Sequence, residues 1–258
     1  MGVQCHVVIP ARYQSVRLPG KPLADICGTP MIVRTAQQAH RAEPLDVIVA
    51  TDDERVVEVV VTAGLEAMLT DPNHPSGSDR VMEVAETRGW SHDAIVINVQ
   101  GDEPLIPPAV IRQVAGILES HPSVDVATLC EPIRDKRSVF DPNVVKVVFD
   151  SDGMALYFSR APIPFARGHF SASETESAGL PAQAQWWRHI GIYGFRIAAL
   201  RRFVKLPVGK LERVEVLEQL RMLVHGIGIH VARAVEPVPG GVDTPEDLDH
   251  VRRSLGSG

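Results

Sequence analysis

Short runs of β-branched and aliphatic residues alternate with amphipathic segments along the first hundred residues of the chain. The apolar runs predict four strands, at 7–9, 47–50, 66–69 and 94–99. Between them, apolar residues recur every three or four positions and predict helices at about 31–41, 54–63 and 79–88. Alternating strands and helices are typical of a parallel sheet covered by helices. We therefore expect an α/β fold with a mixed, mostly parallel central sheet flanked by helices.

Residues that favour helix ends mark the limits of these helices. Thr29 is a suitable N-cap for the first helix, with Pro30 in its first turn. Gly64 and Gly89 follow the second and third helices, where a left-handed residue commonly ends a helix. A fourth helix is expected to begin near 107–108.

The strict alternation ends after residue 118. We expect strands at 124–129, 144–149, 155–158, 189–195 and 229–232, a helix at 211–224, and a last helix capped by Thr244 with Pro245 in its first turn. A loop passes through Pro132 and Pro142. No repeat and no linker divides the chain, so residues 1–258 are expected to form a single domain.

The segment 162–185 is rich in Ser, Ala, Gly, Glu and Pro and has few large apolar residues. This composition indicates a long exposed or mobile loop. An ordered dimer or lid element is the alternative interpretation.

The composition excludes several classes of protein. Apolar residues make up 45% of the 258 residues and charged residues 22%, which excludes disordered, collagen-like and coiled-coil proteins. A formal net charge of −6 argues against nucleic acid as a partner, so an anion site must be a local cluster. The three cysteines lack disulfide or zinc spacing and are expected to be reduced. No apolar run of membrane-spanning length and no secretion signal occurs, so we expect a cytoplasmic protein without membrane partners.

The first predicted strand leads into a long loop with three cations, PARYQSVRLPGKP at 10–22. Most strand-to-helix loops have about two to six residues, and ligands of open α/β sheets bind beyond the carboxyl ends of the strands. Arg12 and Arg17 offer forked donors to phosphate oxygens, and Lys21 offers a movable charge. The loop therefore predicts a polyphosphate site. Solvated surface charges around a simple turn at Gly20 are the alternative.

Neither common phosphate-binding motif is present. Pro22 follows Lys21 where the P-loop requires Ser or Thr, and no G-x-G-x-x-G follows a strand. A P-loop kinase and a nicotinamide dehydrogenase are therefore not expected.

Three further motifs carry polar groups suited to a nucleotide site. Asp102 and Glu103 follow the fourth strand, where carboxylates facing phosphate suit Mg²⁺, although Asp-Glu is also common in solvated turns. Asp243 is a second candidate metal ligand, or it only assists the cap of the last helix. The sequence PSGSDR at 75–80 opens a helix and either contacts a base or phosphate or is simply a cap.

Taken together, these motifs resemble the 3-deoxy-manno-octulosonate cytidylyltransferases, the CMP-Kdo synthetases that activate the acid sugar (Kdo) of the lipopolysaccharide inner core. The first loop is shared widely among nucleotidyltransferases, whereas its combination with the later motifs is specific to this family. The matching motifs occur at 9–12, 17–22, 50–52, 76–80, 98–104, 158–160, 189–194, 217–221 and 241–247.

The resemblance implies a Rossmann-like nucleotidyltransferase fold and transfer of CMP from CTP to Kdo, with release of pyrophosphate. It implies Mg²⁺ as cofactor and a homodimer, for which we expect the interface around 162–187. Trp186 and Trp187 lie either in that interface or in the core.

The resemblance also implies roles for individual residues. Arg12, Arg17 and Lys21 would hold the triphosphate of CTP, Ser76, Ser78 and Arg80 would lie by the cytidine, and Asp102 and Asp243 would hold Mg²⁺. Lys21 would act with these aspartates in catalysis. Gln100, Arg160, His189, Tyr193, Glu215 and Gln219 match sugar-binding positions. Glu215 and Gln219 lie four apart, so they are expected on one helix face, pointing into a cleft or forming a solvated pair.

Three other functions remain open from the sequence. The nearest alternative is a cytidylyltransferase whose sugar is 8-amino-Kdo or sialic acid, since family resemblance does not distinguish sugars that differ by one hydroxyl group. A glycosyltransferase that uses a nucleotide sugar leaves the three-cation loop unexplained. A nucleotide-binding regulator without turnover is disfavoured by Asp102, Asp243 and Lys21 together. Ser78 replaces the threonine usual in the family, and 162–185 matches it only loosely, which leaves the base contacts and the motion of this loop open.

Overall fold

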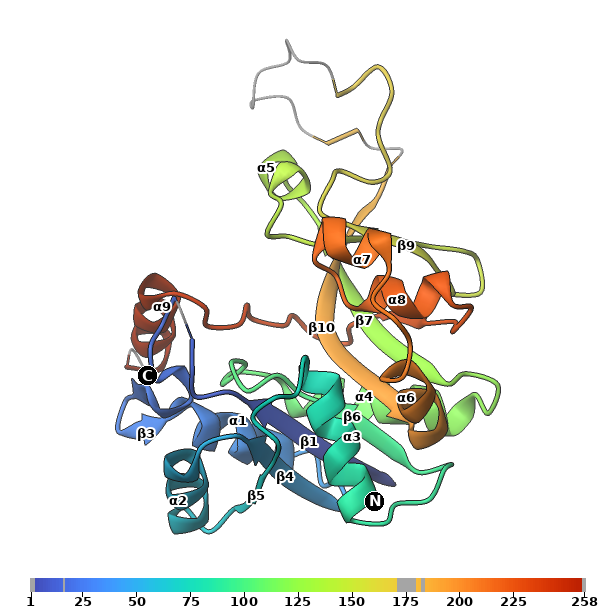
Figure 1. Cartoon of the computed structure of the whole chain (residues 1–258). Helices are drawn as coiled ribbons and strands as arrows, with labels where there is room; N and C mark the ends of the chain where they lie inside the picture. Colours follow the sequence, from blue (N-terminus) through green and yellow to red (C-terminus); the bar gives the residue numbers. More distant parts are fainter. Residues whose placement is uncertain (1–2, 16, 171–179, 182–183, 257–258) are drawn as a thin grey trace.

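The computed structural model describes residues 3–15, 17–170, 180–181 and 184–256, and its centre is a mixed β-sheet. The strand order along the sheet is β11-β7-β10-β6-β1-β4-β5, with β8 and β9 added beside β10 (Figure 1). The strands are β1 (Cys5–Ala11), β4 (Asp46–Thr51), β5 (Glu66–Leu69), β6 (Ile95–Asn98), β7 (Val126–Ile133), β8 (Lys146–Phe149), β9 (Ala155–Ser159), β10 (Trp186–Arg196) and β11 (His230–Arg233). The predicted mixed, mostly parallel sheet is confirmed.

Strand β1 lies between β4 and β6 and is parallel to both. Its buried residues alternate between two cores. Val7 and Ile9 belong to the hydrophobic cluster on one face, and Val8 belongs to the cluster on the other. Both faces of the sheet are therefore covered, which explains why the strands have nearly continuous apolar runs.

Helices supply the other half of each core. The helices are α1 (Met31–His40), α2 (Glu54–Thr62), α3 (Gly77–Thr87), α4 (Pro108–Ser120), α5 (Lys136–Phe140), α6 (Ile197–Phe203), α7 (Lys210–Glu215), α8 (Gln219–Val224) and α9 (Pro245–Gly256), with a 3-10 turn η1 (Lys21–Leu23). Helices α1, α2 and α4 cover one face, whereas α3, α6 and α8 cover the other. No helix in the described ranges is long and apolar enough to cross a membrane.

Several helix ends agree with the sequence. Gly64 and Gly89 have positive φ after α2 and α3, and the backbone N–H of Asp247 donates to the Thr244 hydroxyl at the start of α9. Thr29 is not the cap of α1. Residues Thr29–Pro30 form strand β3 and pair with β2 (Asp25–Ile26). Pro30 occupies the N-cap position without a side-chain cap, and the first helical N–H, that of Met31, donates to the carbonyl of Ala24.

Two other predictions in the second half of the chain are wrong. Pro132 lies inside β7 and not in a loop. Strand β11 pairs with β7 only as far as Cys130, so beyond it β7 has a free edge where proline is tolerated. The expected helix at 211–224 is two helices, α7 and α8, because Val216 adopts a left-handed conformation with φ 53°.

Strand β10 is antiparallel to its neighbours and contains a bulge. Ile190 pairs with Leu129 and Tyr193 with Thr128, so β10 has two more residues than β7 between these pairs. The hydroxyl of Thr128 lies 3.0 Å and 2.8 Å from the carbonyl oxygens of Ile190 and Ile192. The bulge is therefore stabilised by a side chain from the neighbouring strand.

The described parts of 162–185 contain no helix or strand, and residues 171–179 and 182–183 lie outside the described residues. Phe170 packs against Trp186, and Trp186 is fully buried within the chain. Trp186 is therefore a core residue. Cys5 and Cys130 are buried and Cys27 is exposed, and all three are free thiols, as expected.

Candidate active site

The loop after β1 folds back over the carboxyl end of that strand. Gly20 has φ 67°, and a Cβ atom there would lie 3.2 Å from the hydroxyl oxygen of Tyr13. Glycine therefore allows the loop to close on itself just before Lys21. A cavity of about 290 Å³ lies beside the loop. The residues that line it are Pro10, Ala11, Arg12, Gln14, Ser15, Arg17, Lys21, Pro22, Gly77, Arg80, Gln100, Gly101, Asp102 and Asp243.

Lys21 joins the two aspartates that the sequence singles out. Its ammonium nitrogen lies 2.5 Å from Asp102 Oδ2 and 2.9 Å from Asp243 Oδ1. Arg17 Nη2 lies 3.0 Å from the same oxygen of Asp243. Two carboxylates therefore converge on one cationic group at the floor of the cavity.

A backbone contact fixes the two aspartates relative to each other. The N–H of Val242 donates to the carbonyl of Asp102 at 2.8 Å. Val242 itself is buried with Ile26 of β2 and with Leu248 of α9. Helix α9 thus holds the segment that carries Asp243 against the end of β6, although the two aspartates are far apart in the sequence.

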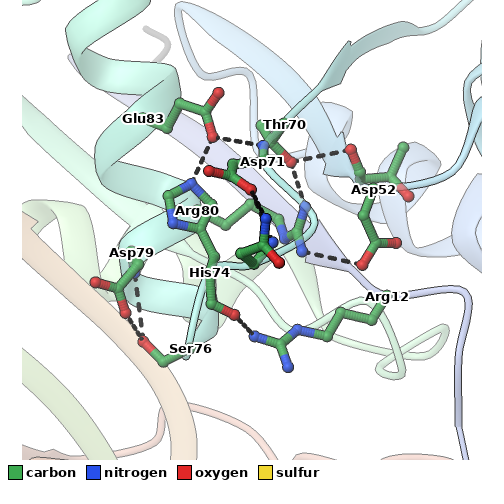
Figure 2. A network of polar contacts seen from close by, with 11 residues as sticks. Arg12, Asp52, Thr70, Asp71, His74, Ser76, Asp79, Arg80 and Glu83 are labelled. Carbon is green, nitrogen blue, oxygen red and sulfur yellow. Dashed lines mark hydrogen bonds and ion pairs between the residues drawn. The ribbon is translucent and has the colours of Figure 1, made fainter.

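Arg12 and Arg80 both line this cavity but have different environments. Arg12 is exposed, and its Nη2 donates to the carbonyl of His74 (Figure 2). Arg80 is fully buried, donates to the hydroxyl of Thr70, and lies 3.2 Å from Asp52 Oδ2. A buried guanidinium is stable only when paired, so Arg80 is held rigidly and Arg12 has donors free for a ligand.

Two serines begin α3 and face a glutamate from another part of the chain. The Ser76 hydroxyl accepts from the backbone N–H of Asp79 as the N-cap of α3, and it lies 2.8 Å from Glu218 Oε1. The Ser78 hydroxyl lies 3.3 Å from Glu218 Oε2. Burial raises the pKa of Glu218. Sequence reasoning missed Glu218 as a site residue, although it lies within the quoted motif at 217–221.

Three of the expected sugar-binding residues share a second, smaller cavity with Ser78. Gln100, Tyr193 and Gln219 line a space of about 70 Å³ that also borders Glu218. Burial raises the pKa of Tyr193 well above its ordinary value, so its phenol is neutral. Gln100 lines both this cavity and the larger one beside Lys21, so it connects the two.

Arg160 and Glu215 form a separate cluster beside α7. The Glu215 carboxylate accepts from the Ser159 hydroxyl at 2.6 Å and from the Arg160 N–H at 2.9 Å. The Arg160 guanidinium donates to the carbonyls of Glu215 and Pro142. Glu215 and Gln219 therefore do not share a helix face as expected, because the helix is broken between them.

His189 is packed among aromatic rings. Its ring lies edge-on to Phe158 at 4.9 Å and near Tyr193 at 5.4 Å, with Nε2 3.1 Å from the Thr128 hydroxyl. Burial lowers the pKa of His189 to about 3, so the imidazole is neutral. The structure thus brings four of the nucleotide candidates and both metal candidates to one cavity: Arg12, Arg17, Lys21, Arg80, Asp102 and Asp243. Ser76 and Ser78 lie against Glu218 outside its lining, and the sugar candidates are distributed over neighbouring clusters.

The donor set suits a hard divalent cation that keeps several positions for other ligands. Asp102 and Asp243 offer carboxylate oxygens, but the described residues contain no group of three or more His, Cys, Asp or Glu placed to hold a metal. Mg²⁺ commonly binds through one or two carboxylates plus substrate phosphates and water. Glu103, the other acid of this motif, does not line the cavity, and burial raises its pKa to about 7.

Comparisons with known proteins show the family of this chain. A family model described as cytidylyltransferase matches residues 6–229. A 3-deoxy-manno-octulosonate cytidylyltransferase of Pseudomonas syringae pv. tomato is 54% identical over 96% of this chain and 97% of its own length. One from Alcanivorax borkumensis is 51% identical, covering 97% and 98% of the two chains. The chain belongs to the 3-deoxy-manno-octulosonate cytidylyltransferase family.

Two solved structures share the fold of this chain. A CMP:2-keto-3-deoxy-manno-octonic acid synthetase complexed with CTP superposes with a TM-score of 0.89 at 40% identity, covering 98% of this chain and 99% of its own. A cytidylyltransferase from Leptospira borgpetersenii has a TM-score of 0.61 at 14% identity and shares the fold. The nucleotidyltransferase fold expected from the resemblance is confirmed.

Some residues of this cytidylyltransferase family member were detectable in the sequence and others were not. Asp52 directly follows β4, so the rule that ligands lie beyond strand ends points to it as it does to Asp102. His74 and Glu83 carry no comparable signal. Their ring and carboxylate meet only because the loop before α3 folds back along that helix (Figure 2).

Proposed function

We propose that this chain transfers CMP from CTP to 3-deoxy-manno-octulosonate, with release of pyrophosphate. The observation that carries the proposal is the cavity beside the first loop, which collects Arg12, Arg17, Lys21, Asp102 and Asp243. Three cations and two carboxylates around one space match a triphosphate accompanied by a divalent cation.

In this mechanism the anomeric hydroxyl of the sugar attacks the α-phosphorus of CTP in line. The new bond joins the sugar oxygen to the α-phosphorus, and the bond to the oxygen shared with the β-phosphorus breaks. The hydroxyl proton passes to solvent. His189 is not assigned as the base, because burial lowers its pKa to about 3 and makes its imidazole a weak proton acceptor. Positioning and charge stabilisation supply most of the acceleration in such reactions.

The cationic side chains have distinct proposed roles. Lys21 is mostly buried at the cavity floor, so its charge acts with little screening on the bridge between the α and β phosphates. Arg12 and Arg17 are exposed and steady the departing pyrophosphate. Ser76, Ser78 and Arg80 border the nucleoside.

Asp102 and Asp243 would hold Mg²⁺, as the convergence of their carboxylates on one cation indicates. When bound, the ion would supply Lewis acidity and lower the pKa of the attacking hydroxyl. Gln100, which lines both cavities, would lie between the nucleotide and the sugar acid. Tyr193, Gln219, His189, Arg160 and Glu215 would form and support the sugar side. A reaction that consumes CTP fits the cytoplasm.

The test is pyrophosphate release by the purified protein with CTP and Mg²⁺. Kdo, 8-amino-Kdo and sialic acid are compared, each with and without EDTA. The proposal expects release with Kdo that EDTA abolishes. Release only with another sugar would change the substrate assignment, and no release with any of the three would refute the reaction. Release that persists in EDTA would refute the metal site.

We further propose a homodimer through the outer end of the molecule, where α5, α7 and β9 lie (Figure 1). Phe140 and Phe165 are 44% and 61% exposed, and both contact the ring of Phe170. Val214 on α7 and Val216 just after it are 82% and 74% exposed. Sedimentation should show a dimer that Phe165→Asp converts to monomer, whereas a monomeric parent protein would refute this assembly.

A further inference from the structure

We propose that Glu83, on helix α3, positions the Arg12 guanidinium for the triphosphate of CTP by holding the loop that carries His74. Glu83 does not line the cavity beside Lys21, so it acts through other residues. The inference rests on the proposed function, because it assigns Arg12 to the nucleotide phosphates.

The first link joins Glu83 to the loop between β5 and α3. A single carboxylate oxygen, Oε2, accepts from the backbone N–H of Asp71 at 3.0 Å and lies 2.5 Å from Nε2 of His74 (Figure 2). The start and the middle of the loop are thereby tied to one atom. Hydrogen bonds to a charged acceptor are stronger than those between neutral groups.

Helix α3 is a rigid support for this atom. Val81 and Val84 are fully buried in the core on that face of the sheet, and Ser76 caps the helix. The pair formed by His74 and Glu83 is itself only partly exposed, with 21% and 32% of the two side chains accessible. The loop is therefore fixed to the core of the domain and not to another surface element.

The second link joins His74 to Arg12. The backbone carbonyl of His74 accepts from Arg12 Nη2, and among the described residues this is the one hydrogen bond of the Arg12 guanidinium. An exposed arginine samples many rotamers, so this bond selects one of them. A guanidinium has five N–H donors, which leaves the others for phosphate oxygens. Glu83 thus sets the position of Arg12 through the backbone of His74.

A purely structural role for Glu83 makes a different prediction. If the carboxylate only stabilised the fold, its loss would lower the fraction of folded enzyme, which reduces the apparent kcat and leaves KM unchanged. If the Glu83 carboxylate positions Arg12, its removal weakens the binding of CTP, because the Arg12 side chain must then be ordered when CTP binds. Ordering one long side chain changes affinity by roughly threefold to tenfold.

The experiment compares Glu83→Ala and Glu83→Gln with the wild type. The matched control is Glu86→Ala, on the same helix, whose carboxylate is 57% exposed and lies 3.7 Å from Arg201. The dissociation constant of CTP is measured by calorimetry with Mg²⁺ and without sugar, and KM and kcat by pyrophosphate release. Glutamine keeps an oxygen where Oε2 lies, so Glu83→Gln should recover most of the affinity.

Glu83→Ala should raise both the dissociation constant and the KM of CTP by roughly threefold to tenfold, with the KM of Kdo unchanged and kcat within about threefold. In an Arg12→Ala background the same substitution should change CTP affinity less than about twofold, because no guanidinium remains to be positioned.

Three results would overturn the inference: unchanged CTP affinity in Glu83→Ala, an equal loss in Glu86→Ala, or the full effect persisting without Arg12. A wild type that binds CTP but releases no pyrophosphate would refute the proposed function instead. The binding measurements would then still decide the role of Glu83.

Discussion

Replacing Asp102 by asparagine is expected to abolish most turnover while leaving the fold nearly as stable. Lys21 lies 2.5 Å from Asp102 and 2.9 Å from Asp243, so it keeps one full carboxylate partner in the variant. The asparagine oxygen can still accept a hydrogen bond from Lys21. Since 30% of the Asp102 side chain is exposed, the free energy of unfolding should fall by only about 1 kcal/mol. For a chain of this size, that lowers Tm by roughly 2–4 °C.

The expected loss of turnover is much larger. A group that stabilises charge in the transition state contributes on the order of 100-fold or more, which corresponds to about 2.7 kcal/mol. Initial rates of pyrophosphate release and thermal melts of the same preparations separate the two effects. Asp249→Asn is a matched control, because Asp249 lies on α9, pairs with Arg252 and is 59% exposed. Turnover by Asp102→Asn within threefold of the wild type would refute the assignment of Asp102.

Three further predictions concern stability. Lys146 is fully buried, and its ammonium group donates to the carbonyls of Asp141, Val144 and Arg160. Lys146→Met removes these hydrogen bonds, so Tm should fall by roughly 6–12 °C in a circular dichroism melt. An unchanged Tm would contradict this anchoring role. Gly194→Ala places a Cβ atom 2.6 Å from Val114 Cγ1 and should cost about 1–3 kcal/mol in urea titrations, whereas Gly116→Ala, with open space at that position, should not. The pKa of His189 is about 3 in the folded protein, against an ordinary value of 6.5. Between these two pH values the unfolded chain binds more protons than the folded one. The free energy of unfolding should therefore fall as the pH decreases from 6.5 toward 3. His189→Gln should reduce that slope in urea titrations across this range, and an unchanged slope would show that other groups determine it.

The arrangement of the first loop and the strand ends was predictable because local rules suffice there. Strands β1 and β6 are adjacent and parallel, so their carboxyl ends meet at one edge of the sheet. Lys21 and Asp102 follow those two strands, and the structure places them in contact. Asp243 was suggested only by its motif, and its position depends on the contact between Val242 and Asp102.

The break at Val216 was not predictable, because its cause is tertiary. A β-branched residue rarely adopts positive φ, and the apolar spacing at 211–224 fits a continuous helix. The Arg160 guanidinium donates to the backbone carbonyl of Glu215. The Ser159 hydroxyl and the Arg160 backbone N–H donate to the Glu215 carboxylate. These contacts come from residues more than fifty positions away, which no local pattern reports.

The partners of Ser76 and Ser78 illustrate the same limit. The sequence marks both serines as cap or ligand residues, whereas the acceptor, Glu218, belongs to a segment 142 and 140 positions away. A cap can be recognised from four neighbouring residues, but a buried acid opposite it depends on how two helices pack.

The bulge in β10 limits which changes of length this strand can tolerate during evolution. Side chains alternate between the two faces of a strand, so an insertion of two residues preserves the face on which every later side chain lies, whereas an insertion of one reverses it. The two extra residues between Ile190 and Tyr193 therefore keep His189 and Tyr193 on one face. Arg188 stays on the opposite face, 2.9 Å from Glu131. Among natural variants, single-residue insertions and deletions here should be selected against, and paired ones should occur more often.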